Sequence, residues 1–207
     1  MTSASVSPAL MGAVELLERS LAYTRVALAD VSPDNLSAAT PCAGWTLSRL
    51  LAHMEDALDA FTEAAGGRVL VDPTPARGDR VETLRDKACA LLGAWADADP
   101  RTVEVGDRAA AAPLIVAMAA LEIAVHGWDV AQATGRRTPI PDDLARGLLP
   151  VAERVVQPAD RGTRFAAARR TATPPTQSEA LIAFLGRMTG PVGRNSGEPP
   201  SPGVIAS

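Results

Sequence analysis

The most informative chemistry in this sequence is a set of three side chains that could bind one divalent metal. Glu122 and His126 lie four residues apart in an apolar stretch, so on a helix both project from one face, with Cβ atoms about 6 Å apart. His53, the other histidine of the chain, lies at the border of a second apolar helical stripe. Two imidazoles and one carboxylate that converge would provide three ligands and leave open positions, as in catalytic zinc sites and the facial triad of non-haem iron.

The same spacing also has a simpler interpretation. A glutamate and a histidine four apart form an ordinary helix pair, and a half-buried histidine is often only hydrogen-bonded. If both histidines bind metal, proton transfer falls to water, to a thiolate or to a carboxylate such as Asp129. Asp129 lies one turn beyond His126 and could orient its ring, or it could be a surface acid.

Four further side chains are candidates for contacts with a substrate. Arg49 lies one turn before His53 and could pair with a carboxylate, and Arg77 and Arg80 could do the same from the loop before the third helix. Tyr23, the only tyrosine, could donate a proton. Each also has a structural interpretation, as a solvated arginine or a half-buried tyrosine.

Composition limits the classes of function. The chain has 207 residues and 47% hydrophobic content, which fits one domain, and its net charge of -4 disfavours binding to nucleic acid. No uninterrupted apolar run of about 18 residues and no signal-like N-terminus is found, so we expect a cytoplasmic protein without a membrane segment. Cys42 and Cys89 are interpreted as buried small hydrophobes rather than as a disulfide or a metal pair.

Turn and capping residues divide the chain into helices. Pro8 and Pro113 suit first helical positions, Thr46 can cap a helix, and Thr176 with Glu179 forms a capping box. The patterns predict helices over 8–29, 47–65, about 79–97, 113–134, 141–155, with a kink or break at Pro150, and a short one after 176.

Helix packing should give the domain its form. Four long amphipathic helices predict an all-α four-helix bundle over 8–190 with a short C-terminal helical extension. Residues 101–108 could hold a short strand or only a loop. Residues 1–7 are expected to be flexible, and 191–207 to form a disordered tail. Walls of the metal site are expected from Leu51, Met54, Met118 and Val125.

Two sequence blocks resemble a known family. PCAGWT at 41–46 leads into the helix of His53, and EIAVHGWDVAQATG at 122–135 contains the other two candidate ligands. These blocks resemble PCxGWT and ExxxHGWDxAxATG motifs of the mycothiol-dependent maleylpyruvate isomerase and DinB-like superfamily. The resemblance extends over about 8–190, including the block at 180–187, and is nearest to a short actinobacterial branch. Lys87 as the only lysine of an arginine-rich and alanine-rich chain also fits a GC-rich source.

The resemblance implies a DinB-like bundle whose metal ligands are His53, Glu122 and His126. It implies one divalent metal, with Zn²⁺ expected first and Fe²⁺, Ni²⁺ or Mn²⁺ as alternatives. It further implies a mycothiol S-transferase or a thiol-dependent isomerase, with mycothiol as co-substrate of a small electrophile, because a metal lowers the pKa of a coordinated thiol. Two alternatives remain open: a thiol-independent metalloenzyme of specialised metabolism, and a non-catalytic metal-binding or ligand-binding protein.

Overall fold

The protein is described by a computed structural model that covers residues 7–69, 79–98, 100–162, 165–171 and 175–188. The predicted flexible N-terminus and tail therefore lie, except for Ser7, outside the described residues. Within these ranges there are six α-helices and three short strands: α1 Pro8–Leu28, α2 Leu47–Ala65, β1 Arg68–Val69, α3 Arg80–Asp97, β2 Thr102–Val105, β3 Arg108–Ala111, α4 Ala112–Ala133, α5 Asp142–Val155 and α6 Gln177–Phe184.

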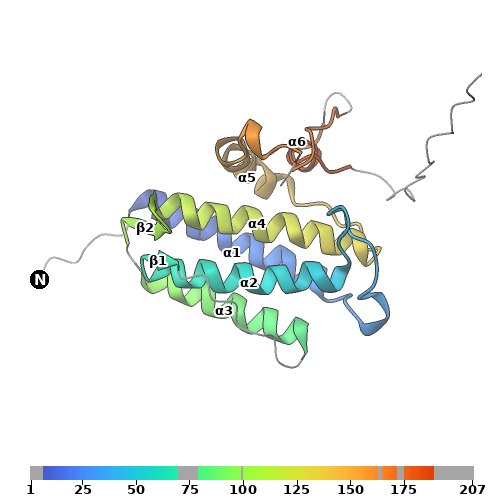
Figure 1. Ribbon diagram of the computed structural model, residues 1–207, viewed down its shortest axis with the longest axis horizontal. Coiled ribbons are helices and arrows are strands. Elements are labelled where there is room, and N and C mark those ends of the chain that lie inside the picture. Colours follow the sequence, from blue (N-terminus) through green and yellow to red (C-terminus); the bar gives the residue numbers. More distant parts are fainter. Residues whose placement is uncertain (1–6, 70–78, 99, 163–164, 172–174, 189–207) are drawn as a thin grey trace, which may run out of the picture.

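The first four helices form the predicted bundle. Helices α1 to α4 run side by side, and α5 and α6 lie outside them, with α5 against α4 and α6 against α5 (Figure 1). Helix α4 packs most extensively on α1, and α2 packs on both α3 and α4. The all-α four-helix bundle with a short C-terminal helical extension is thus confirmed.

Local signals place the helix ends where the sequence predicted them. Thr46 accepts a hydrogen bond from the backbone N–H of Arg49 at the start of α2. At the start of α6, Thr176 and Glu179 form the predicted reciprocal capping box, with bonds of 2.9 and 3.1 Å. Early prolines begin α1 and α4.

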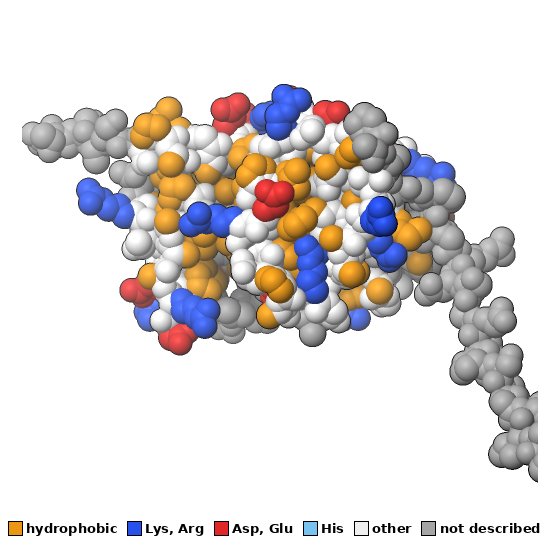
Figure 2. Space-filling view, turned by 90° about the horizontal axis from the view of Figure 1, so that it is seen from above, with side chains coloured by type: hydrophobic (Ala, Val, Ile, Leu, Met, Phe, Trp, Pro, Cys, Tyr) orange, Lys and Arg blue, Asp and Glu red, His pale blue; other side chains and the backbone are white. Residues whose placement is uncertain are grey.

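Helix α4 is the central helix of the core. Its mean hydropathy over an 18-residue window is 1.6, so by length and composition it could cross a membrane, yet 83% of that window is buried inside the bundle. Its apolarity is explained by burial against α1 and α2. On the face shown in Figure 2, side chains of both charges are scattered among hydrophobic ones, and the described part of this face has no continuous basic surface.

Two local features add to or differ from the expectations. Of the two alternatives for 101–108, the short strand is correct: β2 lies there and forms a hairpin with β3 over 102–111. Strand β2 also pairs in parallel with β1, a two-residue strand too short to show a periodic pattern. Helix α5 runs without a break through Pro150. Because Pro150 and Arg146 are both exposed, water can bind the Arg146 carbonyl that lacks its helical partner.

Helices α1 and α4 are in close contact where Gly127 faces Thr24. A Cβ atom on Gly127 would lie 2.3 Å from the Thr24 hydroxyl oxygen and 3.1 Å from its Cα. That hydroxyl donates a 2.8 Å hydrogen bond to the Ile123 carbonyl, so it has little freedom to move. The residue after His126 is therefore set by contact between the two helices.

We expect Gly127→Ala to lower the free energy of unfolding by about 1–3 kcal/mol, because the added methyl group overpacks this contact. Gly93→Ala in α3 is the matched control, since no atom of a neighbouring element lies within 4 Å of the place its methyl group would take. The control should raise stability by up to about 1 kcal/mol through helix propensity. Urea unfolding of both variants measures the difference, and an equal change in both would contradict the close contact.

Candidate metal centre

Three side chains from two neighbouring helices converge as the sequence predicts. His53 comes from α2, and Glu122 and His126 come from α4. Oε1 of Glu122 lies 2.7 Å from Nε2 of His53 and 3.0 Å from Nε2 of His126. One ligand atom from each residue lies within 4.8 Å of the other two. A carboxylate oxygen held between two ring nitrogens is a donor set that suits Zn²⁺ and related divalent ions.

The three side chains differ in their contact with solvent. The side chain of His126 is 10% exposed, whereas those of His53 and Glu122 are 38% and 34% exposed. The ring of His53 is also in edge contact with those of Trp45 and His126, both with centroids 5.1 Å away. The candidate centre is therefore anchored in the core and accessible to small molecules.

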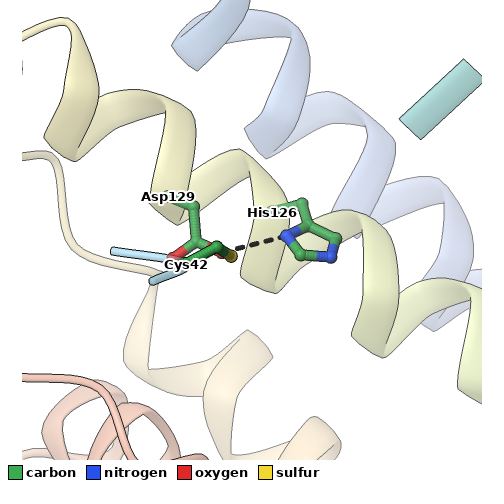
Figure 3. A group of neighbouring side chains, drawn as sticks. All are labelled: Cys42, His126 and Asp129. Atoms are coloured by element: carbon green, nitrogen blue, oxygen red, sulfur yellow. Dashed lines mark hydrogen bonds and ion pairs between the residues drawn. The ribbon is translucent and has the colours of Figure 1, made fainter. Parts of the chain in front are cut away.

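Asp129 fixes the orientation of His126. Its Oδ2 lies 2.9 Å from Nδ1 of His126, one turn back along α4, with the carboxylate turned toward the ring (Figure 3). A proton on Nδ1 that is donated to Asp129 leaves Nε2 as the nitrogen that faces Glu122. This geometry supports the orienting role considered for Asp129 and not that of a surface acid, because its side chain is completely buried.

Arg187 holds Asp129 from the end of the described chain. Two guanidinium nitrogens donate to the two carboxylate oxygens, at 2.8 and 2.7 Å, and the arginine side chain is only 11% exposed. Burial alone would raise the pKa of Asp129, but the adjacent Arg187 and the hydrogen bond with His126 lower it to about 2. Sequence reasoning assigned no role to Arg187, which is 58 residues from its partner.

Cys42 adds a thiol to the same buried cluster. Its sulfur lies 3.3 Å from Oδ2 of Asp129 and 3.6 Å from a nitrogen of Arg187, and Figure 3 shows it beside the carboxylate. Both cysteines are free, as expected, but neither is simply a buried hydrophobe: Cys42 is half-buried among polar groups, and Cys89 is exposed.

A second group of potential ligands consists of Cys42, His126 and Asp129. A cation there would meet the guanidinium of Arg187, which already occupies both oxygens of Asp129. Like charges in a buried site are unfavourable. The donor set built around Glu122 contains no such cation and fits a metal better.

The centre is electrostatically prepared for a positive charge. Burial favours a neutral Glu122, but the two imidazoles beside it, His126 first, lower the pKa of this carboxyl well below its usual range. Burial likewise opposes a charge on His126, yet Glu122 and the hydrogen bond to Asp129 raise its pKa well above the ordinary value. A metal must therefore compete with a proton for Nε2 of His126.

The three arginines considered for substrate contacts have different surroundings. Arg49 is exposed and stacks over Trp45, with its guanidinium carbon 4.7 Å from the ring centroid. Arg80 is the first residue of α3 and not part of the loop before it, and it pairs with the buried carboxylate of Glu55 at 3.0 Å, which gives it a structural partner. Arg77 lies outside the described residues.

Tyr23 also has a structural partner. Its hydroxyl donates a 2.8 Å hydrogen bond to the carbonyl of Thr138, and its ring is buried in the core. Burial first, and then the negative charge of Asp129, raise the pKa of Tyr23. Its proton is thus held by the backbone and is not directed at the three candidate ligands.

A cavity of about 440 Å³ leads to the candidate centre. It lies among the four bundle helices, and Glu122 and His126 form part of its wall. Of the four apolar walls expected from the sequence, Met54 lines the cavity and Leu51, Met118 and Val125 do not. The described residues that line it are Glu18, Leu21, Ala22, Thr24, Arg25, Leu28, Met54, Ala57, Leu58, Leu84, Arg85, Ala88, Cys89, Leu92, Glu122, Ile123 and His126.

The fold and these contacts define a class of helical-bundle proteins with a potential metal site between two core helices. The chain belongs to the mycothiol maleylpyruvate isomerase N-terminal domain family, whose sequence profile matches residues 17–131, more than half of the chain. The family is metal-binding and related to mycothiol. The match includes all three candidate ligands and Asp129 but ends well before Arg187.

Similar proteins occur in Mycobacterium tuberculosis. In strains CDC 1551 / Oshkosh and ATCC 25618 / H37Rv, a protein described as uncharacterized is 28% identical to this chain over 165 residues. The alignment covers 77% of this chain and 89% of the relative. No solved structure matches the chain.

Proposed function

We propose that the protein is a metal-dependent enzyme that joins a small thiol, mycothiol in the source organism, to an electrophile or uses it to isomerise one. The observation that supports this most directly is the convergence of His53, Glu122 and His126 beside a cavity large enough for a small molecule. We further propose Zn²⁺ as the metal, held by the two Nε2 atoms and the carboxylate, within one helical domain over 8–190.

The proposed reaction needs only a thiol and an acceptor. The sulfur forms a bond to an electrophilic carbon, the thiol proton goes to the atom that receives the electron pair, and elimination of the thiol after bond rotation gives an isomer. When bound, a divalent metal lowers the pKa of a thiol that reaches it, so that thiolate is available near neutral pH.

The protein side chains position these reactants. Asp129, itself held by Arg187, keeps Nε2 of His126 directed at the centre. Apolar residues of the cavity limit the water around the electrophile, which strengthens electrostatic interactions there. His53 is 38% exposed and is absent from the cavity lining, so a hydrated thiol can approach on its side while the electrophile occupies the cavity.

Cobalt substitution followed by titration with mycothiol tests the proposal. We expect a sulfur-to-metal charge-transfer band in the near ultraviolet, because the three protein ligands leave the metal an exchangeable position. The titration is best done in a Cys89→Ser variant, since the Cys89 thiol lines the same cavity and could produce the band itself.

The control keeps the metal bound while the added sulfur is varied. The alcohol analogue of the thiol should leave the visible cobalt spectrum and the near ultraviolet unchanged. If cobalt is bound in the wild type, as its ligand-field bands would report, and neither mycothiol nor simpler thiols alter the spectrum, thiol activation is wrong.

A further inference from the structure

We propose that the cavity binds the electrophilic substrate and that this substrate is a mainly apolar molecule with an acidic group at its outer end. Its identification as the electrophile depends on the proposed function, whereas its binding depends only on the cavity. Three properties of the cavity carry the inference: its apolar wall, its charged rim and its depth.

The wall offers very few polar partners. Leucines and alanines from three helices, together with Met54 of α2 and Ile123 of α4, make most of the lining, and the two proposed metal ligands are its main polar groups on the inner side. A polyhydroxylated molecule would lose hydrogen bonds to water there without replacing them, at a cost for each buried hydroxyl. An apolar molecule gains free energy from the same surface.

The rim of the cavity carries uncompensated positive charge. Of the described residues in the lining, the exposed ones come only from α1 and α3, which places the opening between these two helices. The charged residues among them are Glu18, Arg25 and Arg85. Among the residues that the structure describes, neither Arg25 nor Arg85 forms an ion pair. Two arginines against one carboxylate favour an anionic group at the opening.

The depth of the cavity sets the orientation of the ligand. The lining continues from Arg25 and Arg85 at the rim to Glu122 and His126 on α4, so one molecule can contact both ends. With its acid at the arginines, its other end reaches the centre where the thiol would react. A volume of about 440 Å³ is in the range of small-molecule sites.

Binding of decanoate to the zinc-loaded full-length protein, measured by isothermal titration calorimetry, tests this inference. Decanoate should bind at least about threefold tighter than 1-decanol and than decyltrimethylammonium, since exposed ion pairs contribute modestly. Ala88→Phe should weaken decanoate binding at least about tenfold by filling the cavity. Ala90→Phe, an exposed position of the same helix that does not line the cavity, should change it less than twofold.

Two further variants separate the contributions of wall and rim. Ala57→Phe fills the cavity from α2. It replaces Ala88→Phe in the test if Ala88→Phe alters the far-ultraviolet circular dichroism and is therefore not folded like the wild type. The double change Arg25→Gln and Arg85→Gln should weaken decanoate about three- to tenfold and leave 1-decanol unchanged. Arg146→Gln, on the exposed side of α5, is the matched control.

Several outcomes would overturn the inference. The first is that decanoate does not bind at about 1 mM. The second is that the cationic and anionic probes bind equally well. The third is that decanoate binding is lost when zinc is removed, because the acid would then be bound at the metal. A negative cobalt titration with thiols would leave these results untouched, and failure of decanoate to bind would leave the cobalt result untouched. The two proposals can therefore fail separately.

Discussion

Glu122→Ala should weaken zinc binding by at least about 100-fold. Glu122 contributes the carboxylate of the candidate centre, and its oxygen lies between the two imidazoles. Loss of residues that merely orient metal ligands costs about 10–100-fold, so loss of a ligand should cost no less. Competition with a chelator at pH 7 measures the change. Because Glu122 is 34% exposed, the helical circular dichroism should be retained.

The matched control is Glu18→Gln, which removes a carboxylate from the rim of the same cavity without touching a ligand. It should change zinc affinity less than about threefold, because salt and solvent screen the charge of an exposed side chain. If both variants bound zinc as tightly as the wild type, the centre at His53, Glu122 and His126 would be wrong.

Asp129→Ala should destabilise the metal-free protein by about 3–5 kcal/mol. Removal of the carboxylate leaves the guanidinium of Arg187 buried without its charged partner, and an uncompensated buried charge is costly. Urea unfolding without metal measures this cost and separates it from any loss of zinc.

An exposed ion pair and a double variant provide the comparison. Asp30→Ala removes the partner of Arg136 at the surface and should cost no more than about 1 kcal/mol. Asp129→Ala combined with Arg187→Met should recover much of the lost stability, because the buried charge is then absent. A cost for Asp129→Ala as small as for Asp30→Ala would mean that the buried pair is unimportant for folding.

Local patterns were sufficient to predict the helices. Proline at an early helical position, Thr46 as a cap and the pair Thr176 and Glu179 act within four residues, so the sequence contains the whole interaction. The hairpin with β1 was only half anticipated, because a two-residue strand exists through its neighbour β2 rather than through its own pattern.

The candidate centre was predictable in part for the same reason. Glu122 and His126 share a helix, and their spacing alone indicates that they can act together. Resemblance to a family connected them with His53. Arg187 and Cys42 approach Asp129 only after α4, α6 and the loop before α2 are assembled, so no spacing along the chain indicates them. The cavity lining likewise depends on how α1 and α3 are placed relative to each other in the assembled bundle.

The ion pair between Arg187 and Asp129 has a consequence for the order in which the centre can be completed during synthesis. His53, Glu122 and His126 leave the ribosome while residues near 187 are still untranslated. Until Arg187 emerges, the carboxylate that holds His126 has no guanidinium partner, so the bundle can assemble before its histidine is firmly oriented. A chain that ends before residue 187 would thus lack the partner of Asp129, and His126 would be less firmly oriented, although the proposed ligands are all more than sixty positions upstream.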